Sequence, residues 1–215
     1  MKLVRHSYWR SSASHRVRIG LGMKQLPYEY VAVNILAGDQ FADAYRAKNP
    51  IAQVPTLEIT EDDGARIALT QSLPILEYLD ERWPDPPILP RDPYLRARAR
   101  ALAEIVNAGI QPLQNLTTLK RIKALGGDDA AWIRPFIIHG LTAFAAGVAE
   151  VGGTFSVGDF PTVADAALVP QLIAARRFQV DLEPYERLLA IEEHCLRLPA
   201  FADAAPDRQP DAGKL

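Results

Sequence analysis

The chain has 215 residues, of which 48% are hydrophobic and 23% charged, with a formal net charge of −2. This composition is typical of a soluble globular protein of one large or two modest domains. The near-zero charge argues against a general nucleic-acid binder, because neutralising phosphates needs a strong excess of Lys and Arg. The only cysteine, Cys195, excludes an internal disulfide and indicates a reducing compartment. Without a signal peptide or a long apolar run, we expect a cytoplasmic protein that neither spans nor anchors in a membrane.

The first part of the chain alternates between strand and helix patterns. In order, we predict a strand over 2–7, a helix from Ser12, a strand over 28–34, a weaker helix over 39–48, a hairpin with strands 55–60 and 66–69, and a helix over 71–83. The hairpin is indicated by the Asp62-Asp63-Gly64 turn. Pro74 fits the last helix only because it lies in the first turn. This order predicts a small α/β layer over residues 1–83.

A proline-rich segment then divides the chain. Residues 84–93, PDPPILPRDP, contain five prolines, too many for a helix or a central strand. We therefore predict a linker here, followed by a second domain over residues 94–215.

Helical patterns dominate this second domain. We predict one long helix over 94–125 with a kink at Pro112, further helices over 128–151 and 183–198, and a loosely ordered tail from residue 205. Between the latter two helices, Thr162 and Asp165 form a capping box ahead of a buried helix. We expect this box to stabilise the helix and to have no catalytic role.

The stretch RSSASHRVR, residues 10–18, places three serines, a histidine and three arginines just before and within the first helix. Its polar residues can form a helix cap, an anion site or a solvated turn. A helix start carries free amides and partial positive charge, so it stabilises anions as well as caps. A thiol held there would have a pKa below its usual value of about 8.5.

Seven motifs in order carry a resemblance over nearly the whole chain: RSSASHRVRI, NPIAQVPTL, TQSLPILEYLDE, GIQPLQNLTTLK, VGDFPTVADAALVPQ, RRFQVDLEPY and a C-terminal QPD. Together they resemble the zeta class of glutathione transferases. The resemblance implies a thioredoxin-like N-terminal domain with a mixed four-stranded sheet and an all-helical C-terminal domain. It also implies glutathione as the cofactor and a homodimer.

The resemblance further implies a set of glutathione contacts. They are Ser11, Ser12, Gln40, Gln53, Val54, Pro55, Gln71, Ser72, Gln111, Asn115, Leu116 and Thr117. Val54 would precede a cis proline, which turns its backbone groups toward the tripeptide; the plain alternative is a trans proline opening a strand. Ser72 would help the start of its helix bind the γ-glutamyl carboxylate, or would be the N-cap alone. Each glutamine by itself would be interpreted as solvated surface.

The implied reaction is cis–trans isomerisation of a maleyl dicarboxylate. The catalytic set is Ser11, Ser12, Arg10 and Arg177, where Ser11 hydrogen-bonds the glutathione sulfur. Arg10, Arg177 and, ranked lower, Arg176 would bind substrate carboxylates, because guanidinium binds them through two parallel hydrogen bonds. The implied substrate is maleylacetoacetate, from aromatic amino acid breakdown. Alternatives are maleylpyruvate from gentisate breakdown, a general transferase acting on electrophiles, and a scaffold that only retains the fold.

Two positions in the serine motif depart from the usual zeta pattern. Ala13 replaces a cysteine that some relatives need for reductive dehalogenation, which disfavours that activity and leaves isomerisation intact. His15 resembles the maleylpyruvate branch. Arg16 and Arg18 are expected to pair with acidic residues, and His6, His139 and His194 show no metal-binding spacing.

Overall fold

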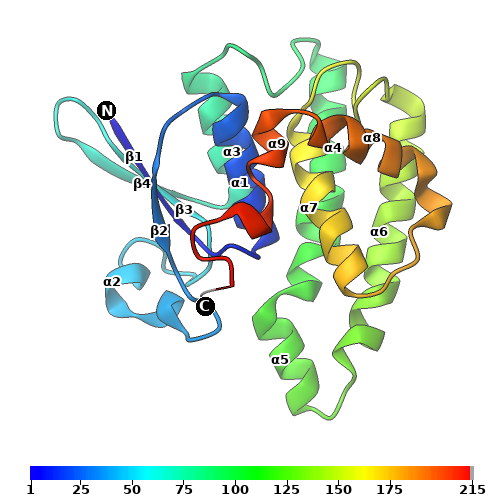
Figure 1. Ribbon diagram of the computed structural model, residues 1–215, viewed down its shortest axis with the longest axis horizontal. Coiled ribbons are helices and arrows are strands. Elements are labelled where there is room, and N and C mark those ends of the chain that lie inside the picture. Colours follow the sequence, from blue (N-terminus) through cyan, green and yellow to red (C-terminus); the bar gives the residue numbers. More distant parts are fainter. Residues whose placement is uncertain (214–215) are drawn as a thin grey trace. The chain divides into compact units, whose positions relative to one another are not determined.

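The computed structural model describes residues 1–213, which form two compact units (Figure 1). The first unit contains residues 1–88 together with the chain from Leu198 onward, and the second contains residues 89–197. The division between residues 88 and 89 falls inside the proline-rich segment that was predicted as a linker. The chain end, predicted to belong to the helical domain, instead packs with the first unit, and residues 214–215 lie outside the described part.

The first unit is a four-stranded mixed sheet with helices. Its elements are β1 (Lys2–Ser7), α1 (Ser12–Met23), β2 (Glu29–Ala32), η1 (Asp39–Phe41), α2 (Asp43–Arg46), β3 (Thr56–Thr60), β4 (Arg66–Thr70), α3 (Ser72–Arg82), α9 (Pro199–Ala202) and η4 (Pro206–Arg208). The strand order is β2-β1-β3-β4, with β1 parallel to β2 and antiparallel to β3, and β3 antiparallel to β4. The predicted α/β layer and its mixed four-stranded sheet are confirmed.

The core of this unit follows directly from sequence periodicity. Leu57 and Ile59 alternate along β3, whereas Val17 and Leu21 on α1 are four residues apart; all four are fully buried in one cluster. A Cβ at Gly20 would overlap Leu76 of α3, so this glycine allows α1 and α3 to approach closely. The helices thus bury one apolar stripe each against the sheet.

The second unit is helical. Its elements are α4 (Pro93–Gly109), η2 (Gln111–Gln114), α5 (Leu116–Ala124), α6 (Asp129–Val151), α7 (Val163–Arg177), η3 (Glu183–Tyr185) and α8 (Glu186–Leu196). The prediction of one kinked helix over 94–125 was wrong, because α4 ends before Pro112. Proline lacks an N–H and disfavours helical backbone at the residue before it, so the chain passes through η2 and restarts as α5.

The capping box at the start of α7 is confirmed. The Thr162 hydroxyl accepts from the Ala164 N–H at 3.2 Å, and the Asp165 carboxylate accepts from the Thr162 N–H at 2.7 Å. Asp165 also accepts from the Ser156 N–H at 2.8 Å, so it fixes the preceding loop as well. Burial raises the pKa of Asp165, while these hydrogen bonds favour its charged form.

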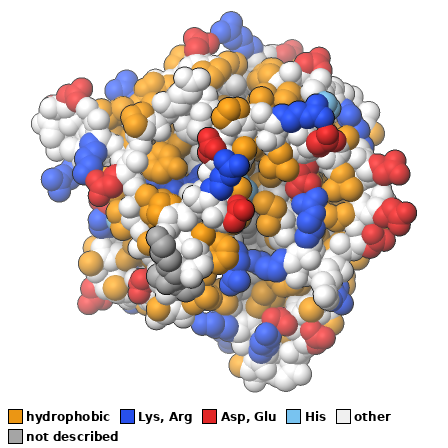
Figure 2. Space-filling view, viewed as in Figure 1, with side chains coloured by type: hydrophobic (Ala, Val, Ile, Leu, Met, Phe, Trp, Pro, Cys, Tyr) orange, Lys and Arg blue, Asp and Glu red, His pale blue; other side chains and the backbone are white. Residues whose placement is uncertain are grey.

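Within residues 1–213, α6 is the one helix long and apolar enough to cross a membrane by length and composition alone. The glycines of α6 allow it to pack closely inside the helical unit. A Cβ at Gly140 would overlap Ile110, and one at Gly147 would overlap Leu102 of α4, so α6 packs closely on its neighbours in the helical unit. On the face shown in Figure 2, positive and negative side chains are interspersed, in keeping with the net charge of −2.

Residues 205–213 are ordered, contrary to the prediction of a loose tail from residue 205. Gln209 and Asp211 are buried, and Phe201 of α9 is fully buried. Arg18 was expected to pair with an acid, but its guanidinium donates to two backbone carbonyls, from Nε to Ala204 O at 2.7 Å and from NH2 to Trp9 O at 3.1 Å. The bond to Ala204 joins the two ends of the chain and leaves no periodic signal in the sequence.

One buried ion pair in the first unit predicts a large stability effect. Lys24, whose side chain is 0% exposed, donates from Nζ to Asp80 at 2.8 Å and to Pro86 O at 2.6 Å. Lys24→Met leaves the Asp80 charge buried without this cation, so we expect the free energy of unfolding to fall by about 3–5 kcal/mol in urea titrations. Lys48→Met, at the half-exposed pair with Glu58, should cost at most about 1 kcal/mol. Equal losses of stability in Lys24→Met and Lys48→Met would contradict the larger role given to the buried pair.

Candidate active site

Three loops meet at one end of the sheet of the first unit. In the strand register, His6 near the end of β1 pairs with Thr56 at the start of β3, and Thr56 pairs with Thr70 at the end of β4. The loop after β1 leads to the serine motif, the loop before β3 contains the Val-Pro pair, and the loop after β4 leads to α3. The register therefore gathers three predicted groups of site residues at one sheet edge.

The first loop ends in the N-cap of α1. The Ser11 hydroxyl accepts from the Ser14 N–H at 3.2 Å, which confirms the capping interpretation. Ser12 is the first helical residue, and both serines are partly exposed. A hydroxyl has one proton and two lone pairs, so accepting this bond leaves the Ser11 proton available to a ligand. Capping and ligand binding are compatible at this serine.

The second loop contains the cis Val54–Pro55 peptide bond, as the resemblance predicted. Two side chains hold the turn before it: the Tyr45 hydroxyl and the Asn49 side-chain amide each donate to the Gln53 carbonyl at 2.6 Å. Both also lie within hydrogen-bond distance of the Thr56 hydroxyl, at 3.0 and 3.1 Å.

Neither of these turn-holding residues was predicted from the sequence. Asn49 opens the quoted motif NPIAQVPTL, which is the signal that could have found it. The role of Tyr45 follows only from the fold, because burial brings its ring under the turn and raises the pKa of its hydroxyl.

The third loop begins α3 with a strained residue. Gln71 is the N-cap with φ of 69° and ψ of 123°, and its side chain makes no capping bond. The prediction of Ser72 as the N-cap was wrong: Ser72 is the first helical residue. Its hydroxyl accepts from Arg16 NH1 at 3.1 Å, which brings α1 and α3 together. With no acidic side chain in the first turn, the helix start offers free amides beside a buried guanidinium.

Gln40 and Gln53 differ in burial and in their hydrogen bonds. Gln40 is buried in η1, donates to Ile35 O at 3.3 Å, and has a buried side-chain oxygen with no hydrogen-bond partner in the described part of the chain. The interpretation as solvated surface was therefore wrong for Gln40. Gln53 is partly exposed, and its backbone carbonyl holds the cis-proline turn.

The predicted residues of the helical unit lie mainly at helix ends. Gln111 opens η2, and Asn115 is the N-cap of α5 without a side-chain capping bond, so the amides of Leu116 and Thr117 at the start of α5 lack that partner. These positions offer free donors, as the start of α3 does.

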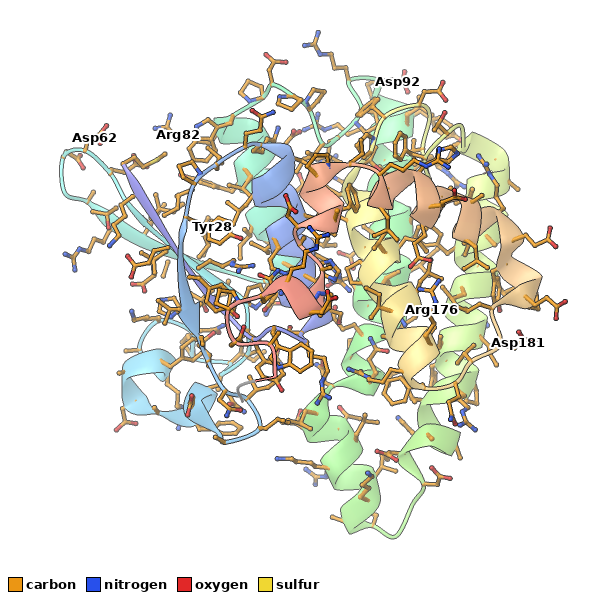
Figure 3. All side chains as sticks on the ribbon, in the orientation of Figure 1. Tyr28, Asp62, Arg82, Asp92, Arg176 and Asp181 are labelled. Carbon is orange, nitrogen blue, oxygen red and sulfur yellow. The ribbon has the colours of Figure 1, made fainter. Side chains whose placement is uncertain are left out.

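Two adjacent arginines end α7 and have different surroundings. Arg176, labelled in Figure 3, binds the Glu192 carboxylate through both terminal nitrogens, NH1 at 2.7 Å, and Glu192 raises its pKa. The guanidinium of Arg177 lies 4.8 Å from the ring centroid of Phe178 and is exposed. Because a carboxylate of its own chain already binds Arg176, this residue is the weaker candidate for binding a substrate carboxylate. Arg10 is also exposed, with its guanidinium 5.5 Å from the Trp9 ring.

His15 predicts a pH dependence of stability. Burial, with the charges of Arg18, Arg5 and Arg16, lowers its pKa well below the usual 6.5, so the folded protein holds the imidazole neutral. Below about pH 6.5 the unfolded chain binds the extra proton, so this contribution is constant above that pH and lost below it, by up to about 1.4 kcal/mol per pH unit. Urea titrations should show a smaller acid-side loss for His15→Gln than for the exposed control His139→Gln; identical slopes would contradict this.

Among residues 1–213, no group of three or more His, Cys, Asp or Glu side chains is placed to hold a metal ion.

Comparison with known proteins identifies the family. Residues 6–87 match the family model for the glutathione S-transferase N-terminal domain. The chain is 45% identical to the maleylpyruvate isomerase of a Ralstonia species, over 99% of this chain and 100% of the relative. It is 52% identical to the maleylacetoacetate isomerase of Anaeromyxobacter dehalogenans, solved with glutathione in its active site, with a TM-score of 0.90 and 98% of each chain covered.

A third relative names the class. A holo maleylpyruvate isomerase, described as a bacterial zeta-class glutathione S-transferase, is 44% identical, with a TM-score of 0.90, over 99% of this chain and 100% of the other. These full-length similarities, with the fold and the three-loop site, show that the chain belongs to the zeta class of the glutathione S-transferase family.

Proposed function

We propose that the chain is a glutathione-dependent cis–trans isomerase that converts maleylacetoacetate to fumarylacetoacetate in aromatic amino acid breakdown. The observation that carries this is the Ser11 hydroxyl, which caps α1 through a lone pair and keeps its proton for an anion. It lies at the sheet edge where the cis-proline turn and the start of α3 also lie. The 52% identical relative holds glutathione in its active site.

The residues of the first unit fit glutathione. The backbone of Val54 before cis Pro55 offers strand-like hydrogen bonds to the tripeptide. The uncapped amides at Gln71 and Ser72, next to the Arg16 guanidinium, suit its γ-glutamyl carboxylate. The unpartnered buried oxygen of Gln40 is one further acceptor.

The other proposed glutathione contacts are Ser11, Ser12, Gln53, Gln111, Asn115, Leu116 and Thr117.

Bound glutathione would supply a thiolate that adds reversibly to the cis double bond, so that bond rotation and elimination give the trans isomer. The chain's own part is to stabilise negative charge: the Ser11 O–H donates to the sulfur, and the N-terminal dipole of α1 favours an anion there. Ser12 lies one residue further along the same helix start. The chain itself supplies no thiol for this step, since Cys195 is its only cysteine and is buried.

Arg10 and Arg177 would bind the two carboxylates of the substrate. Both residues are exposed, each guanidinium lies beside an aromatic ring, and the guanidinium group suits carboxylates because it binds them through two parallel hydrogen bonds. Arg176 is a weaker candidate because Glu192 already occupies it. Binding of its carboxylates would hold the substrate in place and prevent its release before elimination.

Maleylpyruvate is the second candidate substrate, favoured by the 45% identity to a maleylpyruvate isomerase. His15 does not decide between the two, because this residue of α1 is buried, with 2% exposure.

A side-by-side assay tests the proposal. Purified protein is given maleylacetoacetate or maleylpyruvate, with and without glutathione, and loss of the cis isomer is followed. Turnover that requires glutathione supports the isomerase, and the ratio of the two kcat/KM values names the substrate. Activity only toward a chlorinated aromatic would indicate a general transferase, and no activity with any of these would indicate a scaffold.

We also propose a cytoplasmic homodimer that needs neither nucleic acid nor membrane. Exposed apolar side chains on the first unit, among them Phe41, Ile51 and Ile67, support self-association. Light scattering on the purified protein gives the mass directly; a monomer at assay concentration would contradict the dimer.

A further inference from the structure

The peptide groups of Trp9 are held from both sides. Its N–H donates to Asp211 Oδ2 at 3.0 Å, and its carbonyl accepts from Arg18 NH2 at 3.1 Å. Trp9 lies directly before Arg10 and Ser11, and the Ser11 N–H donates to Tyr8 O at 3.0 Å. The loop that presents the proposed catalytic residues is therefore anchored at one peptide, and one anchor comes from the far end of the sequence.

That anchor belongs to an ordered segment, residues 198–213, which we call the C-terminal strap. Figure 1 shows the strap crossing beside α1. At Gly22 of α1 a Cβ would approach the Ala200 Cα within 3.0 Å, so α9 packs directly on this helix. Gln209 donates to Asp203 O at 3.0 Å and to Ala205 O at 2.9 Å, which closes the strap on itself. The strap is thus a fixed support.

The Asp211 carboxylate is itself fixed. It is 4% exposed, and its Oδ1 accepts from the Tyr30 hydroxyl. Tyr30 and Tyr28 place their rings 4.7 and 4.5 Å from the guanidinium of buried Arg5, and Tyr28 is labelled in Figure 3. Asp211 attracts the charges of Arg5 and Arg18, which offsets the cost of burying its carboxylate. Each carboxylate oxygen of Asp211 therefore has its own donor, the Tyr30 hydroxyl for Oδ1 and the Trp9 N–H for Oδ2.

We propose that Asp211 is a positioning residue, which fixes the Trp9 peptide and thereby sets Ser11 and Arg10 in the orientation that thiolate and carboxylate binding require. This inference rests on the proposed function of those two residues. Asp211 touches neither; it acts through one backbone hydrogen bond. Displacement of a reacting group by about 1 Å can cost about 100-fold in rate, so a backbone anchor next to the donor can control turnover.

The test compares Asp211→Ala and Asp211→Asn with Asp207→Ala, a matched control at an exposed carboxylate of the same strap. Asparagine keeps an acceptor for the Trp9 N–H and a partner for Tyr30, but it removes the charge. Steady-state kcat and KM, the pKa of the bound glutathione thiol, melting temperature and amide hydrogen exchange over residues 8–12 are measured on the full-length protein.

We expect Asp211→Ala to lower kcat about tenfold or more, to raise the bound thiol pKa and to speed exchange over residues 8–12. Asp211→Asn should stay within about threefold in kcat despite a lower melting temperature, because it retains the acceptor. Asp207→Ala should match the wild type. Exchange and kcat unchanged in Asp211→Ala would overturn the inference, as would equal losses in the alanine and asparagine variants, which indicate charge balance alone.

The exchange measurement needs no turnover, so the two proposals fail separately. If the wild type turns over neither substrate but Asp211→Ala speeds exchange at residues 8–12, the anchor stands and the isomerase proposal fails. If the wild type turns over and exchange is unchanged, the isomerase stands and the anchor fails.

Discussion

Ser11→Ala is expected to lower kcat/KM about 100-fold and to raise the pKa of the bound glutathione thiol by about one to two pH units. In the proposed mechanism, the Ser11 hydroxyl donates a hydrogen bond to the glutathione sulfur, and alanine removes that donor. Without it, the thiolate loses one donor and is left with the amides and dipole of α1 and the neighbouring Ser12, so less of the thiol is ionised at neutral pH. Ultraviolet titration of the bound thiol and steady-state kinetics measure the two effects independently.

The control for this variant separates capping from thiolate binding. Ser11 also caps α1, and loss of a cap costs about 1 kcal/mol. Asp92→Ala removes the N-cap of α4, where the carboxylate accepts from the Leu95 N–H at 2.9 Å (Figure 3). It should lower stability by a similar amount while leaving the thiol pKa unchanged. Ser11→Thr keeps a hydroxyl and should recover most activity; a thiol pKa equal to wild type in Ser11→Ala would disprove the role.

Arg177→Ala is expected to raise the KM for the maleyl dicarboxylate by about 10- to 100-fold. A hydrogen bond to a charged group contributes about 1.5–3 kcal/mol, and a net loss of about that size at one substrate carboxylate corresponds to this range of KM. The KM for glutathione should change little, because Arg177 is proposed to bind the dicarboxylate and not glutathione. Initial rates over both concentrations give the two constants separately.

The adjacent residue supplies a matched control. Arg176→Ala removes the same side chain one position earlier, but that guanidinium is bound to Glu192. We expect a KM within about threefold of wild type, although the free energy of unfolding should fall, since the Glu192 carboxylate is only 7% exposed and loses this partner. Equal KM increases in the two variants would show that Arg177 has no special place in carboxylate binding.

Local chemistry in the sequence predicted most of the helices and strands. Alternating apolar residues and the Asp-Gly turn are sufficient for the β3–β4 hairpin, and the Thr162/Asp165 spacing is sufficient for the capping box. These features depend on residues a few positions apart, so they are visible without a fold. The resemblance added the cis bond at Pro55, which composition and spacing alone did not favour.

Predictions failed where the outcome depends on residues far apart in the chain. Ser72 looks like an N-cap in sequence, but the helix begins at Ser72 itself, with the strained Gln71 before it and the Arg16 guanidinium on its hydroxyl. The polar tail reads as loosely ordered, yet Gln209 and Asp211 are buried. Neither outcome has a local signal, because each partner lies more than fifty residues away.

The sequence by itself determined the two-part organisation, the helix that starts at the serine motif and the set of residues able to bind an anion or a carboxylate. Only the tertiary structure decided which of them have free donors: Ser11 keeps its proton, whereas Arg176 is bound to Glu192. It also decided that the chain end supports the Trp9 loop through Asp211. The physical reason is that a side chain's capacity for binding is a local property, while its remaining partners depend on what folding brings beside it.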